Sequence, residues 1–516
     1  MGEERTLPPE GAQPNTGNTS GSGSVPGGSQ DLVQGGEPGG TQGDVSGGMF
    51  WKLLELLGTQ GVQFLTALLL ARLMTPEEYG TVGLILIFIT VANTFVQSGF
   101  ATALIRAEEL KEEDYASVLR LSLLIAVPVY GLLCLGAPAV SAFYGIPVLT
   151  PLLRVMGLVL FPGVVISVQT AYVSRGFLFR KLFQANLAAV LLSGAGAVGL
   201  ALLRFGVWAM AAQQLIYYAA LMLALFLVLR WAPSGRFSMA RVKVLFAFGW
   251  KILVSGLIDT LWMNLYGLII GKRYSATDLG GYSRAEQFPK MITANLASAL
   301  QSVLLPAYAR CQTDQEALRE LLRNSIRYSA FAIFPMMAGL AGTAEPLVRM
   351  LLTDKWLFCV PYLRILCLCY AFWPMHVSNL QVLTAMGRSD LFLKLEIVKK
   401  LLGAGILLFS LRYGITGLLL WKAADEFLCT LINAWPVQRL TGVSILSQYR
   451  DMLPPALAAG IMGGLVFLAG RLLPFGGWAG LLAQIAAGMA LYLVLSILLN
   501  RRTLKELAEL LRNRLC

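Results

Sequence analysis

Charged residues are scarce in this chain: they make up 14% of its 516 residues, against 56% hydrophobic residues. A soluble domain contains about 25% charged residues, so the shortage indicates that lipid is the main solvent of the protein. After residue 48 the sequence is a nearly continuous series of apolar runs, each near the roughly 20 residues that a helix needs to cross a bilayer. Because the runs are continuously apolar rather than alternating, they favour a polytopic α-helical membrane protein over a β-barrel.

Histidine occurs once, as His376, which excludes an HExxH zinc motif and a histidine-based catalytic triad. The seven cysteines are scattered, mostly inside apolar runs, and indicate buried thiols rather than a metal site. The GAGAVG run at 194–199 matches the dinucleotide motif but lies within an apolar span, where it favours close helix packing. We therefore expect a protein that is not an enzyme and holds no cofactor or metal.

The first 48 residues differ in kind from the rest. They are rich in Gly, Ser, Pro, Asn and Gln and have almost no large apolar side chains. Such a segment buries too little surface to offset the entropy of ordering, so we expect it to be disordered. It also lacks the basic and apolar regions of a signal peptide.

Apolar runs separated by Gly, Pro and charge predict fourteen transmembrane helices. Loops after even-numbered spans are rich in Lys and Arg, which places both termini in the cytoplasm. The loops that contain Lys272 with Arg273, and Arg349 with Lys355, are exceptions to this pattern. The predicted spans are 51–72, 79–104, 118–142, 151–174, 184–204, 206–229, 250–271, 281–306, 326–343, 359–386, 391–411, 414–438, 453–473 and 477–499.

The sequence contains an internal repeat with a shift of about 200 residues. ARLMTPEEYG at 71–80 matches GKRYSATDLG at 271–280, and WKL at 51–53 matches WKI at 250–252. A repeat of six spans gives two parallel copies, a layout typical of alternating-access transporters. The expected order is a disordered tail at 1–48, an N-terminal lobe at 49–230, a cytoplasmic connector at 231–249, a C-terminal lobe at 250–440, two further helices at 441–500 and a basic cytoplasmic tail at 501–516.

Polar side chains recur along one face of spans one, two, seven and eight. Charge inside a bilayer is costly, so these groups are expected to face protein or water. We expect a hydrophilic cavity between the lobes. For Lys52 and Lys251 the alternative is that each lysine only lies at the cytoplasmic edge of the membrane, at the start of its helix. Arg284 is suited to a bidentate clamp on phosphate, with Lys290 as a point charge. The candidate cavity residues are Arg284, Lys290, Asp259, Lys251, Lys52, Gln287, Asn295, Gln97, Asn93 and Gln63.

A second polar cluster lies in span twelve. Lys422, Asp425 and Glu426 are candidates for ion coupling. The alternative is that Lys422 and Glu426, four residues apart, simply neutralise each other along the helix.

The motifs LLARLMTPEEYGTVGL, FGVWAMAAQQL, GYSRAEQF and LLPAYAR resemble those of the polysaccharide transporter family of oligosaccharide flippases, near its Wzx/colanic-acid exporter branch. The resemblance covers roughly residues 49–500 and extends to the MOP superfamily, with its lipid II flippases and MATE exporters. It implies translocation of an undecaprenyl-pyrophosphate-linked oligosaccharide across the bacterial inner membrane for lipopolysaccharide or other surface polysaccharide synthesis. It also implies a cavity cation at Arg284, with a polymerase and a chain-length regulator as partners.

Three other functions stay open. A MATE-type exporter would have acidic cavity residues and cationic drugs as substrates, and a lipid II flippase shares the superfamily. The cavity expected here is mixed, because Glu55 and Asp259 accompany its cations. A membrane glycosyltransferase or polymerase is least favoured, because no predicted periplasmic loop exceeds about 15 residues, too short for the long catalytic loops of that class. No nucleic-acid partner is expected, since the net charge of +12 reflects orientation.

Overall fold

The computed structural model describes residues 42–97, 99–107, 110–472, 477–506 and 509, with the side chains of 42–57, 247 and 248 excluded. The chain divides into two compact units, Met1–Gly47 and Gly48–Cys516. The expected disorder of residues 1–41 lies outside the described residues. Residues 42–48, in contrast, are already helical, because extending a formed helix by a turn costs far less than nucleating one. Everything below concerns the second unit.

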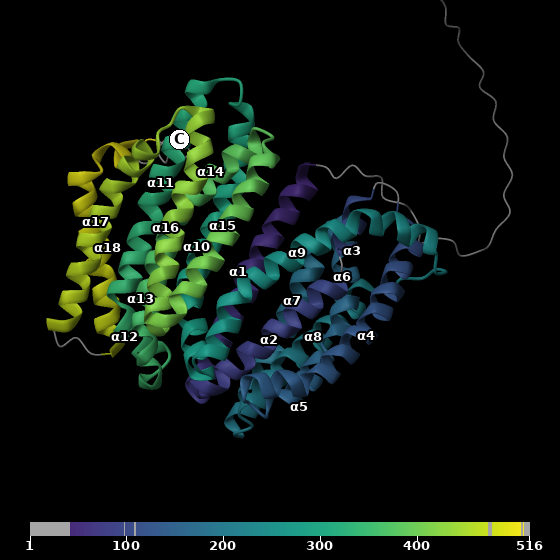
Figure 1. The fold of residues 1–516 in the computed structure, drawn as a ribbon. Helices are drawn as coiled ribbons and strands as arrows, with labels where there is room; N and C mark the ends of the chain where they lie inside the picture. The colour runs from purple at the N-terminus through teal and green to yellow at the C-terminus, as the bar shows by residue number, and fades with distance from the viewer. Residues whose placement is uncertain (1–41, 98, 108–109, 473–476, 507–508, 510–516) are drawn as a thin grey trace, which may run out of the picture. The chain divides into compact units, whose positions relative to one another are not determined.

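The described residues form helices and no strand (Figure 1). Three predicted spans are broken by a short turn or kink, so there are more helices than spans. The helices are α1 (Gln42–Leu73), α2 (Pro76–Gln97), α3 (Phe100–Arg106), α4 (Glu112–Tyr144), α5 (Leu149–Gly157), α6 (Leu160–Arg175), α7 (Phe179–Leu202), α8 (Val207–Leu229), α9 (Met239–Arg273), α10 (Ala276–Arg310), α11 (Gln315–Gly342), α12 (Ala344–Leu351), α13 (Val360–Ala371), α14 (Trp373–Ala385), α15 (Ser389–Ser410), α16 (Gly414–Thr441), α17 (Ile445–Leu472) and α18 (Gly477–Leu499), with 3-10 turns at Asp354–Cys359 and Leu411–Tyr413.

Nine of the described helical segments are long and apolar enough to cross a membrane, or ten with the bent pair α11–α12. The expected count of fourteen is therefore not confirmed. Among the described helices that fall short of this test are α10, α15 and α16, although each has at least 22 residues. They fall short because charged side chains interrupt their apolar character, and these same helices line the cavities described below.

The repeated sequence at 71–80 and 271–280 forms the same structure twice, a helix end, a two-residue turn and a helix start. In the first copy the Glu78 amide donates to Thr75 Oγ1 at 3.3 Å and the Thr75 amide donates to the Glu78 carboxylate at 2.7 Å. In the second copy the Asp278 amide donates to Ser275 Oγ at 3.0 Å. These are helix N-caps, and the first is a full capping box.

The two copies of this turn meet each other. A Cβ atom added to Gly80 would lie 1.6 Å from the Ala276 carbonyl oxygen, and one added to Gly280 would lie 2.1 Å from the Pro76 oxygen. Only glycine permits backbones to approach this closely. The glycine that ends each copy of the repeat therefore sets the crossing of α2 and α10.

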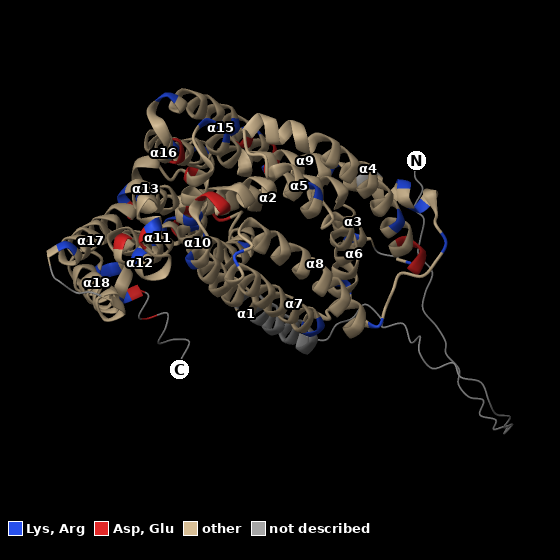
Figure 2. Ribbon diagram, turned by 90° about the horizontal axis from the view of Figure 1, so that it is seen from below, with Lys and Arg blue, Asp and Glu red and all other residues tan. Residues whose placement is uncertain are grey.

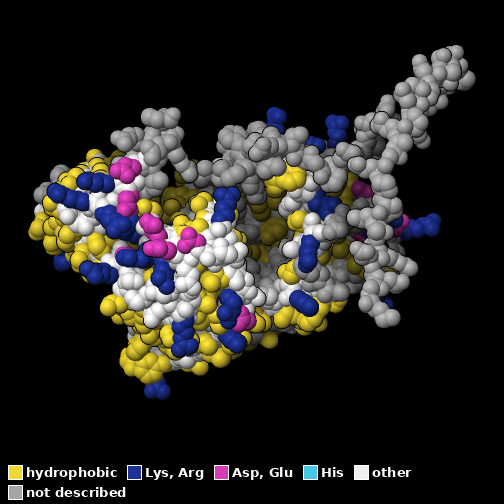
Figure 3. Space-filling model, turned by 90° about the horizontal axis from the view of Figure 1, so that it is seen from above, with side chains coloured by type: hydrophobic (Ala, Val, Ile, Leu, Met, Phe, Trp, Pro, Cys, Tyr) yellow, Lys and Arg dark blue, Asp and Glu magenta, His cyan; other side chains and the backbone are white. Residues whose placement is uncertain are grey.

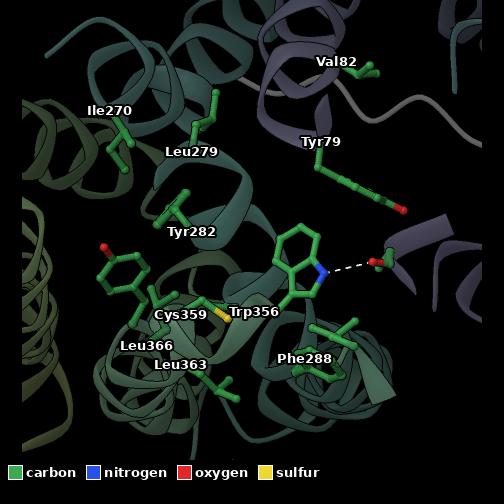
Figure 4. Close-up of a cluster of buried hydrophobic side chains, with 14 of the residues drawn as sticks. Tyr79, Val82, Ile270, Leu279, Tyr282, Phe288, Trp356, Cys359, Leu363 and Leu366 are labelled. Atoms are coloured by element: carbon green, nitrogen blue, oxygen red, sulfur yellow. Dashed lines mark hydrogen bonds between the residues drawn. The ribbon is translucent and has the colours of Figure 1, made fainter. Parts of the chain in front are cut away.

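A cluster of buried side chains packs around this crossing (Figure 4). The Trp356 indole donates to the Ala71 carbonyl at 2.9 Å, and its ring packs edge-on against Tyr79 with centroids 5.5 Å apart. Lys355 donates to the Arg72 carbonyl at 2.7 Å. Lys355, one of the cations that depart from the loop-charge pattern, thus donates a hydrogen bond from one half of the repeat to the other.

The segment expected as the connector, 231–249, is partly helical, because α9 begins at Met239. Its start is tied to α4: the Arg241 guanidinium donates to both Asp114 carboxylate oxygens, at 2.7 and 2.6 Å. The Trp231 ring stacks on Tyr172 with centroids 4.0 Å apart. The described connector residues therefore dock on the preceding helices.

Candidate functional site: a cationic cavity beside α10

A cavity of about 500 Å³ is lined by residues of α1, α2, α7, α8 and α10. Figure 2 shows the ribbons of these helices, with Lys and Arg positions in blue. Its wall combines amide side chains, two cations, aromatic rings and a few aliphatic groups. No acidic residue is among its lining residues in the described part of the chain. The polar and aromatic lining residues are Gln60, Gln63, Phe64, Tyr79, Ser193, Gln213, Gln214, Tyr217, Arg284, Gln287, Lys290 and Asn295.

Helix α10 supplies both cations. Arg284, Gln287 and Lys290 are three residues apart and therefore recur on one side of the helix. The Arg284 guanidinium lies over the Tyr79 ring, 4.3 Å from its centroid, a cation–π contact. Its Nε is buried without a hydrogen-bond partner among the described residues.

Neither cation has a carboxylate partner among the described side chains. Within the described ranges no ion pair involves Arg284 or Lys290. Removing charge from water without a counter-ion is costly. Two unpaired cations beside a polar cavity therefore make a site for an anion, with amides positioned to bind uncharged polar groups.

The structure brings five of the ten predicted cavity residues together. They come from spans one and eight and line this one cavity: Gln63, Arg284, Gln287, Lys290 and Asn295.

The other predicted residues lie elsewhere. Asp259 is paired with Lys400 of α15, because its face of α9 turns toward the C-terminal helices. Lys251 is exposed, and Asn93 packs against Gly163 of α6. Gln97 is half-buried at the end of α2 and is not a lining residue.

The side chains of Lys52 and Glu55 lie outside the described residues. Asp259 does not line the cavity, and the described lining has cations alone. The expected mixed charge, which also rested on Glu55, stays a prediction.

Sequence reasoning missed the contribution of α7 and α8. Gln213, Gln214 and Tyr217 of α8 line the cavity together with Ser193 of α7. The signal was present, because Gln213 and Gln214 belong to the FGVWAMAAQQL motif. The flanking residues form a uniformly apolar span, so these amides were not predicted to line a cavity.

A buried ion pair between α10 and α16 was also missed. Lys422 Nζ lies 3.0 Å from a Glu286 carboxylate oxygen and donates to the Tyr282 hydroxyl at 2.9 Å. Tyr282 and Tyr370 donate to the same carboxylate at 2.7 and 3.3 Å. The expected neutralisation of Lys422 by Glu426 along α16 is therefore wrong, because a partner on another helix lies closer.

A second cavity, of about 570 Å³, lies among α9, α10, α14, α15 and α16. Glu426 faces His376 there, 3.5 Å from its Nε2, and Asp425 lies nearby on the wall. Lys399 is paired with Glu396 at 2.5 Å. This cavity contains both signs of charge, mostly paired, whereas the first contains unpaired cations.

The long apolar helices define a multi-spanning membrane protein. A family model described as "Polysaccharide biosynthesis protein" matches residues 69–361. The chain belongs to that family. The resemblance seen in the sequence motifs is thereby confirmed.

Curated relatives agree over most of the chain. The succinoglycan biosynthesis transport protein ExoT of Rhizobium meliloti is 26% identical, with 90% of this chain and 95% of the relative covered. The lipopolysaccharide biosynthesis protein WzxC of Escherichia coli is 24% identical, with 69% and 73% covered.

Solved structures of MOP-superfamily transporters have the same fold. The lipid II flippase MurJ, in an inward closed conformation, superposes with a TM-score of 0.69 at 15% identity over 87% of this chain and 99% of that one. An inward-facing MATE transporter gives 0.59 at 17% identity, over 77% and 98%. At such identities the likeness shows the fold alone.

Proposed function

We propose that the protein is a flippase that moves an undecaprenyl-pyrophosphate-linked oligosaccharide across the bacterial inner membrane for surface polysaccharide synthesis. Membership of a polysaccharide biosynthesis family and the relatives named for succinoglycan transport and lipopolysaccharide biosynthesis support this. The transporter fold supports a translocation step rather than bond chemistry. A polymerase and a chain-length regulator are the partners expected downstream.

The observation on which the proposal rests is the pair of cations, Arg284 and Lys290, that line a cavity whose described lining holds no acid. An arginine fork and a lysine ammonium match the charge and oxygen geometry of a diphosphate. The surrounding glutamine and asparagine amides both donate and accept hydrogen bonds, which suits sugar hydroxyls. Tyr79, stacked on Arg284, holds the guanidinium in place.

We propose alternating access of two lobes, at 49–230 and 250–440, as the mechanism. The repeated turn and the meeting of Gly80 with Gly280 support two copies related about this contact. A transporter of this kind closes one end while the substrate site opens to the other. The hydrogen bonds of Trp356 and Lys355 across the crossing support a closed state of this end.

Charge supports a cytoplasmic location for the end of the molecule shown in Figure 3. Lys and Arg side chains are spread across this face, and Asp and Glu form a smaller group. The positive-inside rule places such a face in the cytoplasm. Both termini are proposed to lie on this side.

Replacing Arg284 and Lys290 with alanine at matched protein level tests the proposal. Transport should fall at least tenfold in the double variant, because each charge-assisted contact contributes about 1.5–3 kcal/mol. Lys251→Ala is the matched control, since this exposed lysine lies outside the cavity lining. Surface polysaccharide in a strain lacking its own flippase is the readout. Full export by R284A/K290A would refute the site.

Asp425 and Glu426 of the second cavity are proposed to couple transport to a cation gradient. Lys422 is left out of this role, because Glu286 already neutralises it. Asp425→Asn should abolish the dependence of flipping on an imposed ion gradient in proteoliposomes. An unchanged dependence would refute coupling there. If drug resistance rather than export responded to these variants, the MATE-type alternative would be favoured.

A further inference from the structure

A groove of about 490 Å³ lies between α11, α12, α17 and α18, away from both cavities. Its wall is almost entirely apolar and reaches Ile292 of α10. In a membrane protein such a groove faces hydrocarbon, and an apolar chain fills it at no cost in desolvation. The side chains that form it include Met336, Leu340, Met462, Val466, Met489 and Leu493.

A pocket of arginines adjoins one end of this groove. Arg349, Arg364 and Arg471 line a space of about 500 Å³ together with a single acid, Glu345. Arg349 is paired with Glu345 and Asp354, at 3.5 and 2.9 Å. Arg364 lies over the Phe467 ring, 4.8 Å from its centroid. Arg471 is exposed and has no ion pair among the described residues.

Gln484 joins the groove to the pocket, because it lines both. Its side chain is 6% exposed, and its Oε1 has no hydrogen-bond partner among the described residues. A buried amide oxygen without a donor is costly and points to a missing partner. A hydroxyl group of a ligand that spans groove and pocket would supply that donor.

The pocket lies at the depth of lipid headgroups. Trp478, at the start of α18, is 52% exposed, and exposed tryptophans mark the membrane–water interface. The 23 residues of α18 span about 34 Å, enough to cross the hydrocarbon core of about 30 Å. Gln484 therefore lies about 10 Å below the interface, and the groove continues into the hydrocarbon.

We propose that this pocket and groove form a binding site for an anionic phospholipid, with its phosphate at Arg364 and Arg471 and one acyl chain in the groove. Arg349 is neutralised by Glu345 and Asp354, whereas Arg364 and Arg471 have no ion pair among the described residues, and this remaining positive charge favours a lipid with net negative charge over a zwitterionic one. The site also explains a departure from the loop-charge pattern. Arg349 belongs to a predicted non-cytoplasmic loop, where the positive-inside rule disfavours cations. A cation there is explained if it contributes to a binding site.

Native mass spectrometry of the purified full chain tests this. The protein is released from bilayers of equal phosphatidylglycerol and phosphatidylethanolamine, and the retained lipids are counted. The unmodified chain should retain one phosphatidylglycerol in preference. Replacing Arg364 and Arg471 with glutamine should weaken that retention about thirtyfold, from the loss of two phosphate contacts. Arg412→Gln, an exposed arginine outside the pocket, is the matched control and should change nothing.

A second variant tests the groove. Met489 lines it and is 61% exposed, so Met489→Trp should fill the groove without disturbing the core and should displace the lipid. Equal retention of the two phospholipids by the unmodified chain would overturn the proposal. So would unchanged retention of phosphatidylglycerol by R364Q/R471Q. Retention of added polyprenyl phosphate in place of phosphatidylglycerol would assign the site to the carrier lipid and would also overturn it.

Discussion

Breaking the ion pair between Glu286 and Lys422 should destabilise the protein far more than breaking a surface pair. The two charged atoms are 3.0 Å apart, with side chains 20% and 13% exposed. Removing one partner of a buried pair leaves an uncompensated charge and costs about 3–5 kcal/mol. Glu286→Gln and Lys422→Met should therefore each lower stability by that order.

The double variant distinguishes pairing from simple loss of volume. With both charges gone no buried charge is left unpaired, so the double variant should be more stable than either single variant. The coupling energy from the cycle should be about 3 kcal/mol, above the range expected for independent sites. Tyr282 and Tyr370 keep hydrogen-bonding capacity beside the site in all variants.

Thermal unfolding of purified protein, followed by tryptophan fluorescence, measures the effect. Glu345→Gln is the matched control, because the Glu345–Arg349 pair is four residues apart on α12 with side chains 52% and 49% exposed. Such a pair contributes about 0.3–0.5 kcal/mol. Equal effects of E286Q and E345Q, or additive effects in the double variant, would refute the reasoning.

Three further predictions concern the lobe crossing and the C-terminal segment. Gly80→Ala should greatly reduce folded protein on size exclusion, because its Cβ would overlap a backbone oxygen, whereas Gly136→Ala, with open space around it, should not. Trp356→Phe should lower the melting temperature by leaving the Ala71 carbonyl unpaired, at a cost of about 1–3 kcal/mol; an unchanged melting curve would contradict this. Partial burial acts to raise the pKa of Glu506, but hydrogen bonds from Arg502 and Tyr328 outweigh it and hold the pKa below its usual value. The ionised Glu506 therefore stabilises the folded protein fully above the usual glutamate pKa, and this contribution is lost as the pH falls through the lowered pKa of the folded state. Limited proteolysis should then release the C-terminal segment at acid pH. Glu506→Gln should remove that pH dependence.

The helical class and the repeat were predictable, because both depend on local patterns. Apolar length predicts a membrane helix, and the matching turns at 71–80 and 271–280 have the same caps in the structure. What the repeat could not show is that Gly80 and Gly280 contact each other. Sequence similarity identifies equivalent positions, but not which of them meet across an axis.

Five of the ten predicted residues line the cavity, for a similar reason. The stripe of Arg284, Gln287 and Lys290 has helical spacing, so their common face follows from the sequence alone. The partner of Asp259 does not follow from the sequence, because Lys400 lies 141 positions away. Ion pairs along one helix are visible as spacings of three or four, whereas pairs between helices depend on rotation about each helix axis.

Helix α10 shows why this rotation matters for function. Arg284 and Glu286 are two positions apart, which places them about 200° apart around the helix. Arg284 therefore faces the cavity, while Glu286 fixes the opposite side of the helix to α16 through Lys422. Lys290, four positions after Glu286, lies only about 40° from it around the axis. Because both groups belong to one helix, the buried pair helps to fix Arg284 at the cavity. The GYSRAEQF motif thus contains both Arg284 of the candidate site and Glu286, which contacts α16.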